Sequence, residues 1–168
     1  MELSAYSDNW VICYKQEKKL LENTLKGFLK YSIIEHIGAT SVIYCKTLGT
    51  IDLLLSIPRQ LDLFTFKNYL SHNGYEEIVN KSSPTSFFMV RRNENRQIIA
   101  TIRIVEYASH TYNVIKAFKD FLKDSKSNVR KYNEYRENLL QMYGNDYSKY
   151  EKGKIDFINS IIKEHFRF

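Results

Sequence analysis

The chain has 168 residues, of which 43% are hydrophobic and 26% charged, and its formal net charge at pH 7 is +6. This length predicts a single domain, residues 1–168, and no apolar run reaches the roughly 20 residues of a membrane-spanning helix, which argues against a membrane protein. The positive charge favours an anionic partner such as a nucleotide, a nucleic acid or an acidic metabolite. Because the N-terminus carries no secretory signal pattern, we expect a cytoplasmic protein.

The first 109 residues alternate between helical and strand patterns. Apolar side chains recur at helical intervals from about Asn9 to Tyr31 and again from Leu61 to His72. Segments rich in β-branched or alternating apolar residues predict five strands, at Ile33–Ile37, Thr50–Ile57, Tyr75–Val79, Ser86–Arg91 and Gln97–Tyr107. The first two strands are almost continuously apolar, which predicts that they are covered on both faces.

The residues after His110 follow a helical period. They predict three helices, at Tyr112–Lys123, Asn128–Met142 and Tyr147–His165. The order of all elements predicts an α+β domain. Its mixed β-sheet, flanked by helices, spans about residues 9–109, and a C-terminal helical segment spans about residues 110–168.

One carboxylate lies in the most apolar predicted strand. Asp52 follows a turn of small residues that contains Gly38, Thr40 and Ser41. Backbone N–H groups and hydroxyls at such a turn hold phosphate oxygens, and a carboxylate on the next strand holds the Mg²⁺ that bridges them. Because a buried carboxylate is costly unless it is paired or metal-bound, Asp52 is our candidate catalytic and metal-binding residue. The alternative is a structural role, in which Asp52 caps a turn or pairs with an arginine.

Two basic side chains are candidate contacts for a bound anion. His36 lies just before the glycine turn, where it either contacts a substrate or fixes the turn through a hydrogen bond. Arg91 ends a predicted strand next to a polar hairpin, where it either reaches a phosphate or serves as an ordinary hairpin charge. Both interpretations of each residue stay open at this stage.

The run Ile34-Glu35-His36-Ile37-Gly38-Ala39-Thr40-Ser41-Val42, followed by Thr50-Ile51-Asp52-Leu53-Leu54, resembles the hallmark of the GrpB family. In that family a His-Ile/Val-Gly-Ser-Thr-Ser/Ala-Val run precedes a Pro-Ile-Ile-Asp-Ile strand. Further matches run to the end of the chain, at Asn73-Gly74-Tyr75, Val105-Glu106-Tyr107-Ala108-Ser109 and Tyr150…Lys154…Phe157-Ile158. Because the GrpB family is placed in the nucleotidyltransferase superfamily, the resemblance implies a nucleotidyltransferase-like fold.

The resemblance also implies a chemistry. Active members of the superfamily use paired acids to hold two Mg²⁺ ions, which align the nucleotide α-phosphate with an incoming hydroxyl. Carried over to this chain, a nucleoside triphosphate would lie with its phosphates at Gly38, Thr40 and Ser41 and with Mg²⁺ on Asp52. The implied reaction moves a nucleotide onto a small molecule or a protein.

Several departures mark the chain as a divergent member. The position of the second acid is Leu54, and two family histidines fall on Thr101 and Arg103. Lys46 is a candidate replacement for a family lysine that is absent before the Asp52 strand, and Glu106 is a candidate displaced carboxylate. One acid is too few for a conventional two-metal reaction.

These departures leave three function classes open. The first is nucleotidyl transfer at Asp52. The second is a catalytically degenerate protein that binds a nucleotide or an anionic metabolite in the same cleft, with positive charge from His36, Arg91 and Arg103; Arg103 would pair with Asp52 or form an anion site that needs no metal. The third, and weakest, is a protein-interaction or nucleic-acid-binding role of the basic, tyrosine-rich C-terminal helices.

Overall fold

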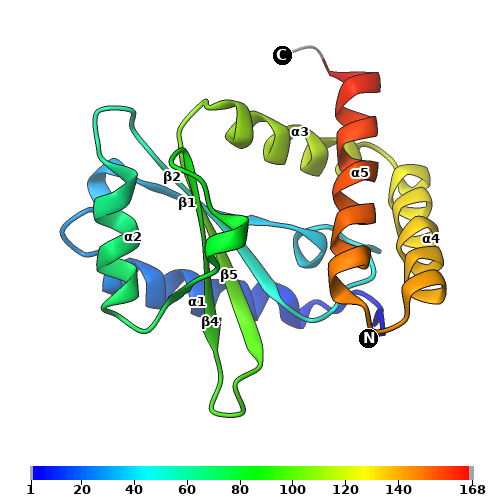
Figure 1. The fold of residues 1–168 in the computed structure, drawn as a ribbon, viewed down its shortest axis with the longest axis horizontal. Coiled ribbons are helices and arrows are strands. Elements are labelled where there is room, and N and C mark those ends of the chain that lie inside the picture. Colours follow the sequence, from blue (N-terminus) through cyan, green and yellow to red (C-terminus); the bar gives the residue numbers. More distant parts are fainter. Residues whose placement is uncertain (1, 167–168) are drawn as a thin grey trace.

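A five-stranded sheet forms the centre of the molecule. The computed structural model describes residues 2–166, and Figure 1 shows helices on both faces of the sheet. The strands lie in the order β1-β2-β5-β4-β3, with bounds β1 Ile33–Ile37, β2 Ile51–Ile57, β3 Glu76–Glu77, β4 Ser86–Arg92 and β5 Ile98–Glu106. β2 and β5 run parallel, and the other neighbouring pairs are antiparallel. The mixed sheet and the α+β class predicted from the sequence are confirmed.

Two helices, α1 (Asn9–Thr24) and α2 (Leu63–Ser71), cover one face of the sheet (Figure 1). Alternate residues of each strand point to this face because the side chains of a strand alternate. The buried cluster that results contains Leu21, Leu25, Ile51, Leu53, Leu55, Ile57, Phe66, Leu70, Ile102 and Ile104. Asp62 starts α2, since its side chain accepts the N–H groups of Phe64 and Thr65.

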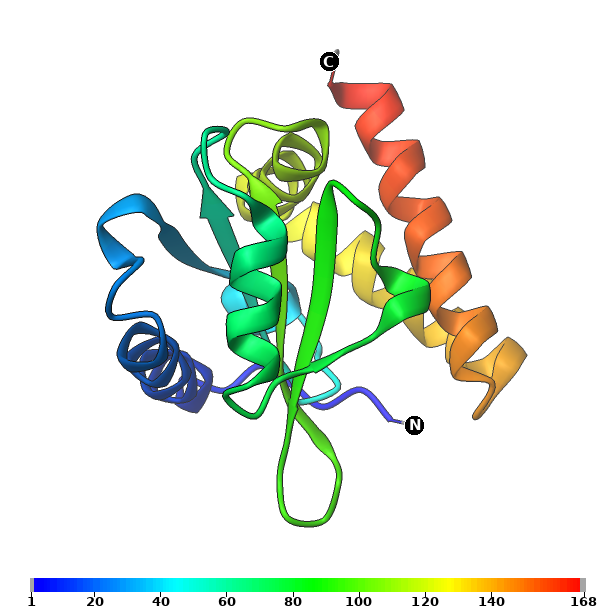
Figure 2. The same cartoon turned by 60° about the vertical axis from the view of Figure 1, so that its left-hand side comes forward.

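The opposite face belongs to the C-terminal helices α3 (His110–Asp124), α4 (Lys126–Tyr143) and α5 (Tyr147–His165). Tyr112 and Ile115 of α3 pack against the sheet residues Ile37, Leu54 and Val105. The three helices also pack on one another around an aromatic cluster of Phe118, Phe121, Tyr132 and Phe157. Figure 2 shows the turn after β3 beside the first half of α5. No helix within residues 2–166 combines the length and the apolar character needed to cross a membrane.

Two predicted elements are shorter in the structure by more than a few residues or by most of their length. α1 ends at Thr24, and the remainder of the predicted helix is a loop with a 3-10 turn at Leu29–Tyr31. Gly27 lies in this loop, and glycine is a poor helix former. The third strand keeps only Glu76–Glu77, because the chain folds into a 3-10 turn at Val79–Lys81 directly afterwards. That turn brings Lys81 to the same side of the sheet as α5.

Candidate functional site

The candidate site starts where the turn after β1 meets β2. Asp52 lies opposite Ile37, the last residue of β1, and Gly38 follows with φ of +70° before the 3-10 turn Ala39–Ser41. A Cβ atom on Gly38 would lie 2.2 Å from Oδ2 of Asp52 and 2.9 Å from its Cγ. Only glycine fits here, both because of its positive φ and because of this approach. The backbone of the turn and the Asp52 carboxylate are therefore in direct contact.

The Asp52 carboxyl is partly buried and hydrogen-bonded to the neighbouring strand. Its Oδ1 accepts a hydrogen bond from Oγ1 of Thr101 at 2.6 Å, across the parallel β2–β5 pair. Burial raises the pKa of Asp52 above the usual aspartate value, although the Thr101 hydrogen bond and the nearby Lys154 oppose this. The carboxyl is thus easier to protonate than an ordinary aspartate.

Arg103 lies on the same face as Asp52, two residues along β5 from Thr101, where it is opposite Leu54. Its guanidinium donates to the carbonyl oxygen of Lys81 at 2.6 Å and lies 4.4 Å from the ring centroid of Phe88. Burial lowers its pKa to about 10, against the opposing effect of Asp52. The sequence left two alternatives for Arg103, an ion pair with Asp52 or an anion site. Among the described residues no ion pair joins Arg103 to Asp52, so the first alternative is not formed.

Helix α5 brings three further side chains to this face. Glu151 pairs with Lys81 at 3.3 Å and also with Lys154 on the next turn of its own helix. Burial lowers the pKa of Lys154, but Glu151 outweighs this, and the net shift is upward. Burial likewise raises the pKa of Glu151, but the two lysines outweigh it and the net shift is downward. The ring of Tyr147 lies 5.1 Å from the Lys81 ammonium.

The hydroxyls predicted to face phosphates hold the turn itself. Thr40 is fully buried, and its Oγ1 lies 3.0 Å from Nε2 of His36 and 3.3 Å from the carbonyl oxygen of Thr50. Ser41 donates its hydroxyl to the carbonyl oxygen of Gly38 at 2.7 Å. In this arrangement both hydroxyls stabilise the turn that brings Gly38 to Asp52.

His36 and Arg91 lie on the other face of the sheet from Asp52. The His36 ring stacks on Tyr14 of α1, with centroids 4.4 Å apart, and burial lowers its pKa to about 4. Arg91 pairs with Glu17 of α1. Because neighbouring residues of a strand face opposite sides, neither side chain points to the Asp52 face, and we leave both out of the proposed site.

Lys46 is also separate from the Asp52 cluster, since it pairs with Glu137 of α4. By contrast, sequence reasoning missed Lys81, Glu151 and Lys154. Lys154 was visible only as one of the residues shared with the GrpB family, and the spacing of Glu151 and Lys154 is that of an ordinary helical ion pair. Only the fold brings them to β2 and β5.

The residues at Asp52 do not fit a two-metal centre. Leu54, at the position of the second acid, is fully buried, and β5 offers Thr101 and Arg103 beside Asp52. The possible substitute Glu106 pairs instead with Arg59 at 3.5 Å. Within residues 2–166 no three or more His, Cys, Asp or Glu side chains gather where they could hold a metal ion. One carboxylate beside an arginine is suited to an anion rather than to a pair of Mg²⁺ ions.

Comparisons with known proteins identify the family of the chain. The family model described as GrpB protein matches residues 1–164. The glutamate-rich protein GrpB of Alkalihalophilus pseudofirmus is 27% identical over 165 residues, which cover 96% of this chain and 94% of that protein.

Solved structures agree. The crystal structure of GrpB from Enterococcus faecalis superposes with a TM-score of 0.79 at 22% identity, covering 97% of this chain and 96% of the other. The Cid1 poly(U) polymerase with bound MgGTP superposes with a TM-score of 0.56 at 10% identity, over 82% of this chain but only 45% of Cid1. The fold is therefore nucleotidyltransferase-like, and the chain belongs to the GrpB family.

Proposed function

We propose that this protein binds a nucleotide, or a similar phosphate-bearing metabolite, on the sheet face that carries Asp52. The contact between Gly38 and Asp52 is the observation that carries the proposal. Without a side chain at Gly38, the backbone of the turn packs directly against the Asp52 carboxylate, next to a cluster of charged side chains. The resemblance in fold to Cid1, whose structure holds MgGTP, supports a nucleotide as the ligand.

The charges around Asp52 favour an anion. Three cations, Lys81, Arg103 and Lys154, surround two carboxylates, Asp52 and Glu151. Arg103 is held by a backbone carbonyl and an aromatic ring, so its remaining N–H groups have a fixed direction for a phosphate oxygen. The two lysines already share one carboxylate, that of Glu151, so a bound phosphate competes with Glu151 for their ammonium groups.

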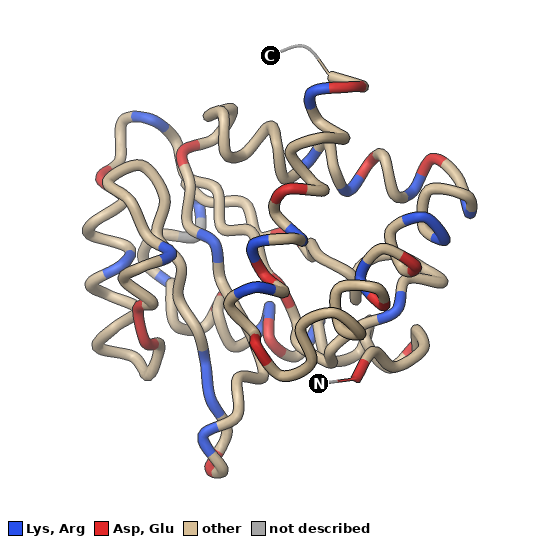
Figure 3. The backbone as a smooth tube through the Cα atoms, turned by 45° about the vertical axis from the view of Figure 1, so that its right-hand side comes forward, with Lys and Arg blue, Asp and Glu red and all other residues tan. Residues whose placement is uncertain are grey.

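Nucleotidyl transfer is the second candidate. It is favoured by the presence of an acid beside a glycine turn in a nucleotidyltransferase-like fold. It ranks second because a transfer assisted by Mg²⁺ needs ligands that the residues beside Asp52 do not supply. A nucleic-acid role ranks below both, since Figure 3 shows Lys and Arg spread along the chain and interleaved with Asp and Glu.

Calorimetric titration of the purified chain with ATP, GTP, CTP and UTP, each with Mg²⁺ or with EDTA, separates these candidates. Under the binding proposal at least one nucleotide binds in EDTA. Arg103→Lys weakens binding about 10-fold, because lysine lacks the planar guanidinium group with its paired N–H donors. Arg92→Lys is the matched control, because Arg92 lies in the same sheet but pairs with Glu76 near the exposed hairpin. Binding that requires Mg²⁺ and disappears in Asp52→Asn would favour transfer. If no nucleotide binds in either condition, both candidates are wrong.

A further inference from the structure

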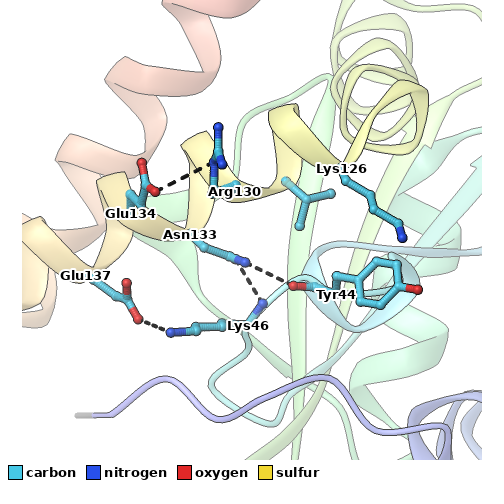
Figure 4. A pocket seen from close by; sticks show the side chains of 8 residues that line it. Tyr44, Lys46, Lys126, Arg130, Asn133, Glu134 and Glu137 are labelled. Carbon is cyan, nitrogen blue, oxygen red and sulfur yellow. Dashed lines mark hydrogen bonds and ion pairs between the residues drawn. The ribbon is translucent and has the colours of Figure 1, made fainter.

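A second concave site lies away from Asp52, between α4 and the loop that follows the glycine turn. The cavity has a volume of about 320 Å³, near the lower end of the range for small-ligand pockets. Figure 4 shows Tyr44 and Lys126 at one end and the Lys46–Glu137 pair at the other. Its lining consists of Tyr44, Lys46, Lys126, Val129, Arg130, Asn133, Glu134 and Glu137. None of these residues belongs to the Asp52 cluster.

The loop is built so that Tyr44 presents its ring to water. Tyr44 has φ of +67°, a conformation that is costly for a bulky residue, and 59% of its surface is exposed. The buried side chain of Asn133 holds this backbone on both sides. It donates to the carbonyl oxygen of Tyr44 and accepts from the N–H of Lys46, both at 2.9 Å. Burial of the ring does not explain the strain, because the ring remains outside the core.

A buried arginine adds positive charge behind the loop. Arg136 is 3% exposed, and it donates to the carbonyl oxygen of Lys46 and to Oδ1 of Asn133. Across residues 2–166 no carboxylate lies within 4.0 Å of the Arg136 guanidinium. An uncompensated buried charge raises the potential of its surroundings, so it favours an anion in the adjacent cavity.

The cations at the mouth of the cavity are available to a ligand. The Lys126 ammonium lies 4.7 Å from the centroid of the Tyr44 ring and, in the described part of the chain, pairs with no carboxylate. The Arg130 side chain is 75% exposed and lies 3.9 Å from Glu134, which is also exposed, so this ion pair is weak. Lys126 is also the first residue of α4, where the positive end of the helix dipole adds to its charge.

We propose that this cavity binds a planar base joined to a phosphate, with the base stacked on Tyr44 and the phosphate between Lys126 and Arg130. An exposed ring with one cation beside it and a second one turn along α4, in the same cavity, is an arrangement that recognises a nucleotide by stacking and charge together. The group is either a free mononucleotide or the terminal nucleotide of a single strand. This site is separate from the one proposed at Asp52 and does not depend on it.

Nuclear magnetic resonance of the isotope-labelled chain tests the proposal with AMP as the probe. We expect saturable shifts at Tyr44, Lys126 and Arg130, with a Kd on the order of 1 mM or tighter. Adenosine and inorganic phosphate, each carrying half of the recognised group, are expected to bind at least about 10-fold more weakly. The oligonucleotide A6 is the second arm: tighter binding than AMP identifies a strand end as the source, and equal or weaker binding identifies the mononucleotide.

Substitutions test the role of the ring. Tyr44→Ala should weaken AMP binding about 10-fold, whereas Tyr44→Phe keeps the ring and should stay within about 2-fold of the wild type. Tyr31→Ala is the matched control, because Tyr31 is also exposed and has Lys30 at 4.5 Å from its ring centroid but does not line the cavity. Asp52→Asn should leave these shifts unchanged, so a failure here is distinguishable from a failure at Asp52. The proposal is overturned if AMP shifts none of the three residues, or if Tyr44→Ala binds like the wild type.

Discussion

Gly38 and Asp52 are in contact at a position where no side chain can be added without displacing the Asp52 carboxylate. The Cβ of any other residue at position 38 would meet the Asp52 carboxylate at 2.2 Å. The contact fixes the carboxylate against the backbone of the turn, and the Thr101 hydrogen bond fixes its other oxygen. The function proposed for this face depends on that arrangement.

Gly38→Ala should lower the free energy of unfolding by about 2–4 kcal/mol, because it adds a steric conflict with Asp52 to the cost of a positive φ. Chemical denaturation measures this directly. Gly74→Ala is the matched control: Gly74 has φ of +86° but no heavy atom within 4 Å of the added Cβ, so it should cost only about 1 kcal/mol. If both variants lose the same free energy of unfolding, the contact with Asp52 does not contribute to the cost of Gly38→Ala.

Asp52→Asn should stabilise the ligand-free protein at neutral pH. Burial raises the pKa of Asp52 in the folded state, so the folded protein holds this proton more tightly than the unfolded chain does. The contribution of Asp52 to stability therefore falls as pH rises from the ordinary aspartate pKa through the folded-state pKa, and it stays low above that range. Denaturation of wild type and variant from pH 4 to pH 8 should show an advantage of the variant that grows with pH. A constant difference over this range would contradict the prediction.

Much of the fold is predictable from the sequence because local patterns and packing agree. The apolar strand around Leu53 and Leu55 is buried as its composition indicates, and its neighbours follow the same alternation. The predicted helix beyond Thr24 fails where Gly27 interrupts a pattern that is otherwise periodic. Period and composition thus locate elements well but do not give their ends.

The site is less predictable, because a sequence does not state which face of a sheet a side chain occupies relative to a distant helix. His36 and Asp52 are close in sequence and on paired strands, yet they point to opposite faces. Glu151 and Lys154 are about a hundred residues from Asp52 and reach its surroundings only because α5 packs on that side. Residue type made Asp52 a candidate, whereas its neighbours in space required the tertiary structure.

His36 should make the protein less stable in acid. Burial against Tyr14 lowers its pKa to about 4, well under the ordinary histidine value. Because the unfolded chain takes up this proton first, stability is lost as pH falls from about 6.5 toward 4. Titration followed by the ring resonances should give a midpoint near 4, and His36→Gln should remove that part of the acid sensitivity. A midpoint near the ordinary value would contradict the burial of the ring.

Glu151→Gln should increase the affinity for an anionic ligand on the Asp52 face and lower the stability of the ligand-free protein. Glu151 now neutralises Lys81 and Lys154, so a phosphate must compete with it for both ammonium groups. Removing the negative charge leaves the two lysines near each other without a carboxylate between them, which costs about 1–3 kcal/mol in the free protein. That cost is recovered when a phosphate binds, and the gain in nucleotide affinity should be about 5-fold or more.

Calorimetry with the nucleotide that binds the wild type most tightly, and denaturation with and without it, measure both effects. Glu22→Gln is the matched control, since Glu22 pairs with Lys18 on the exposed side of α1 and should change neither quantity by more than about 0.5 kcal/mol. Arg103→Lys, made both in the wild type and in Glu151→Gln, separates the contribution of Arg103 from that of the two lysines. It should weaken nucleotide binding in both proteins. If Glu151→Gln lowers stability but leaves affinity unchanged, the lysines of α5 and of the turn after β3 hold the fold together and do not contact the ligand.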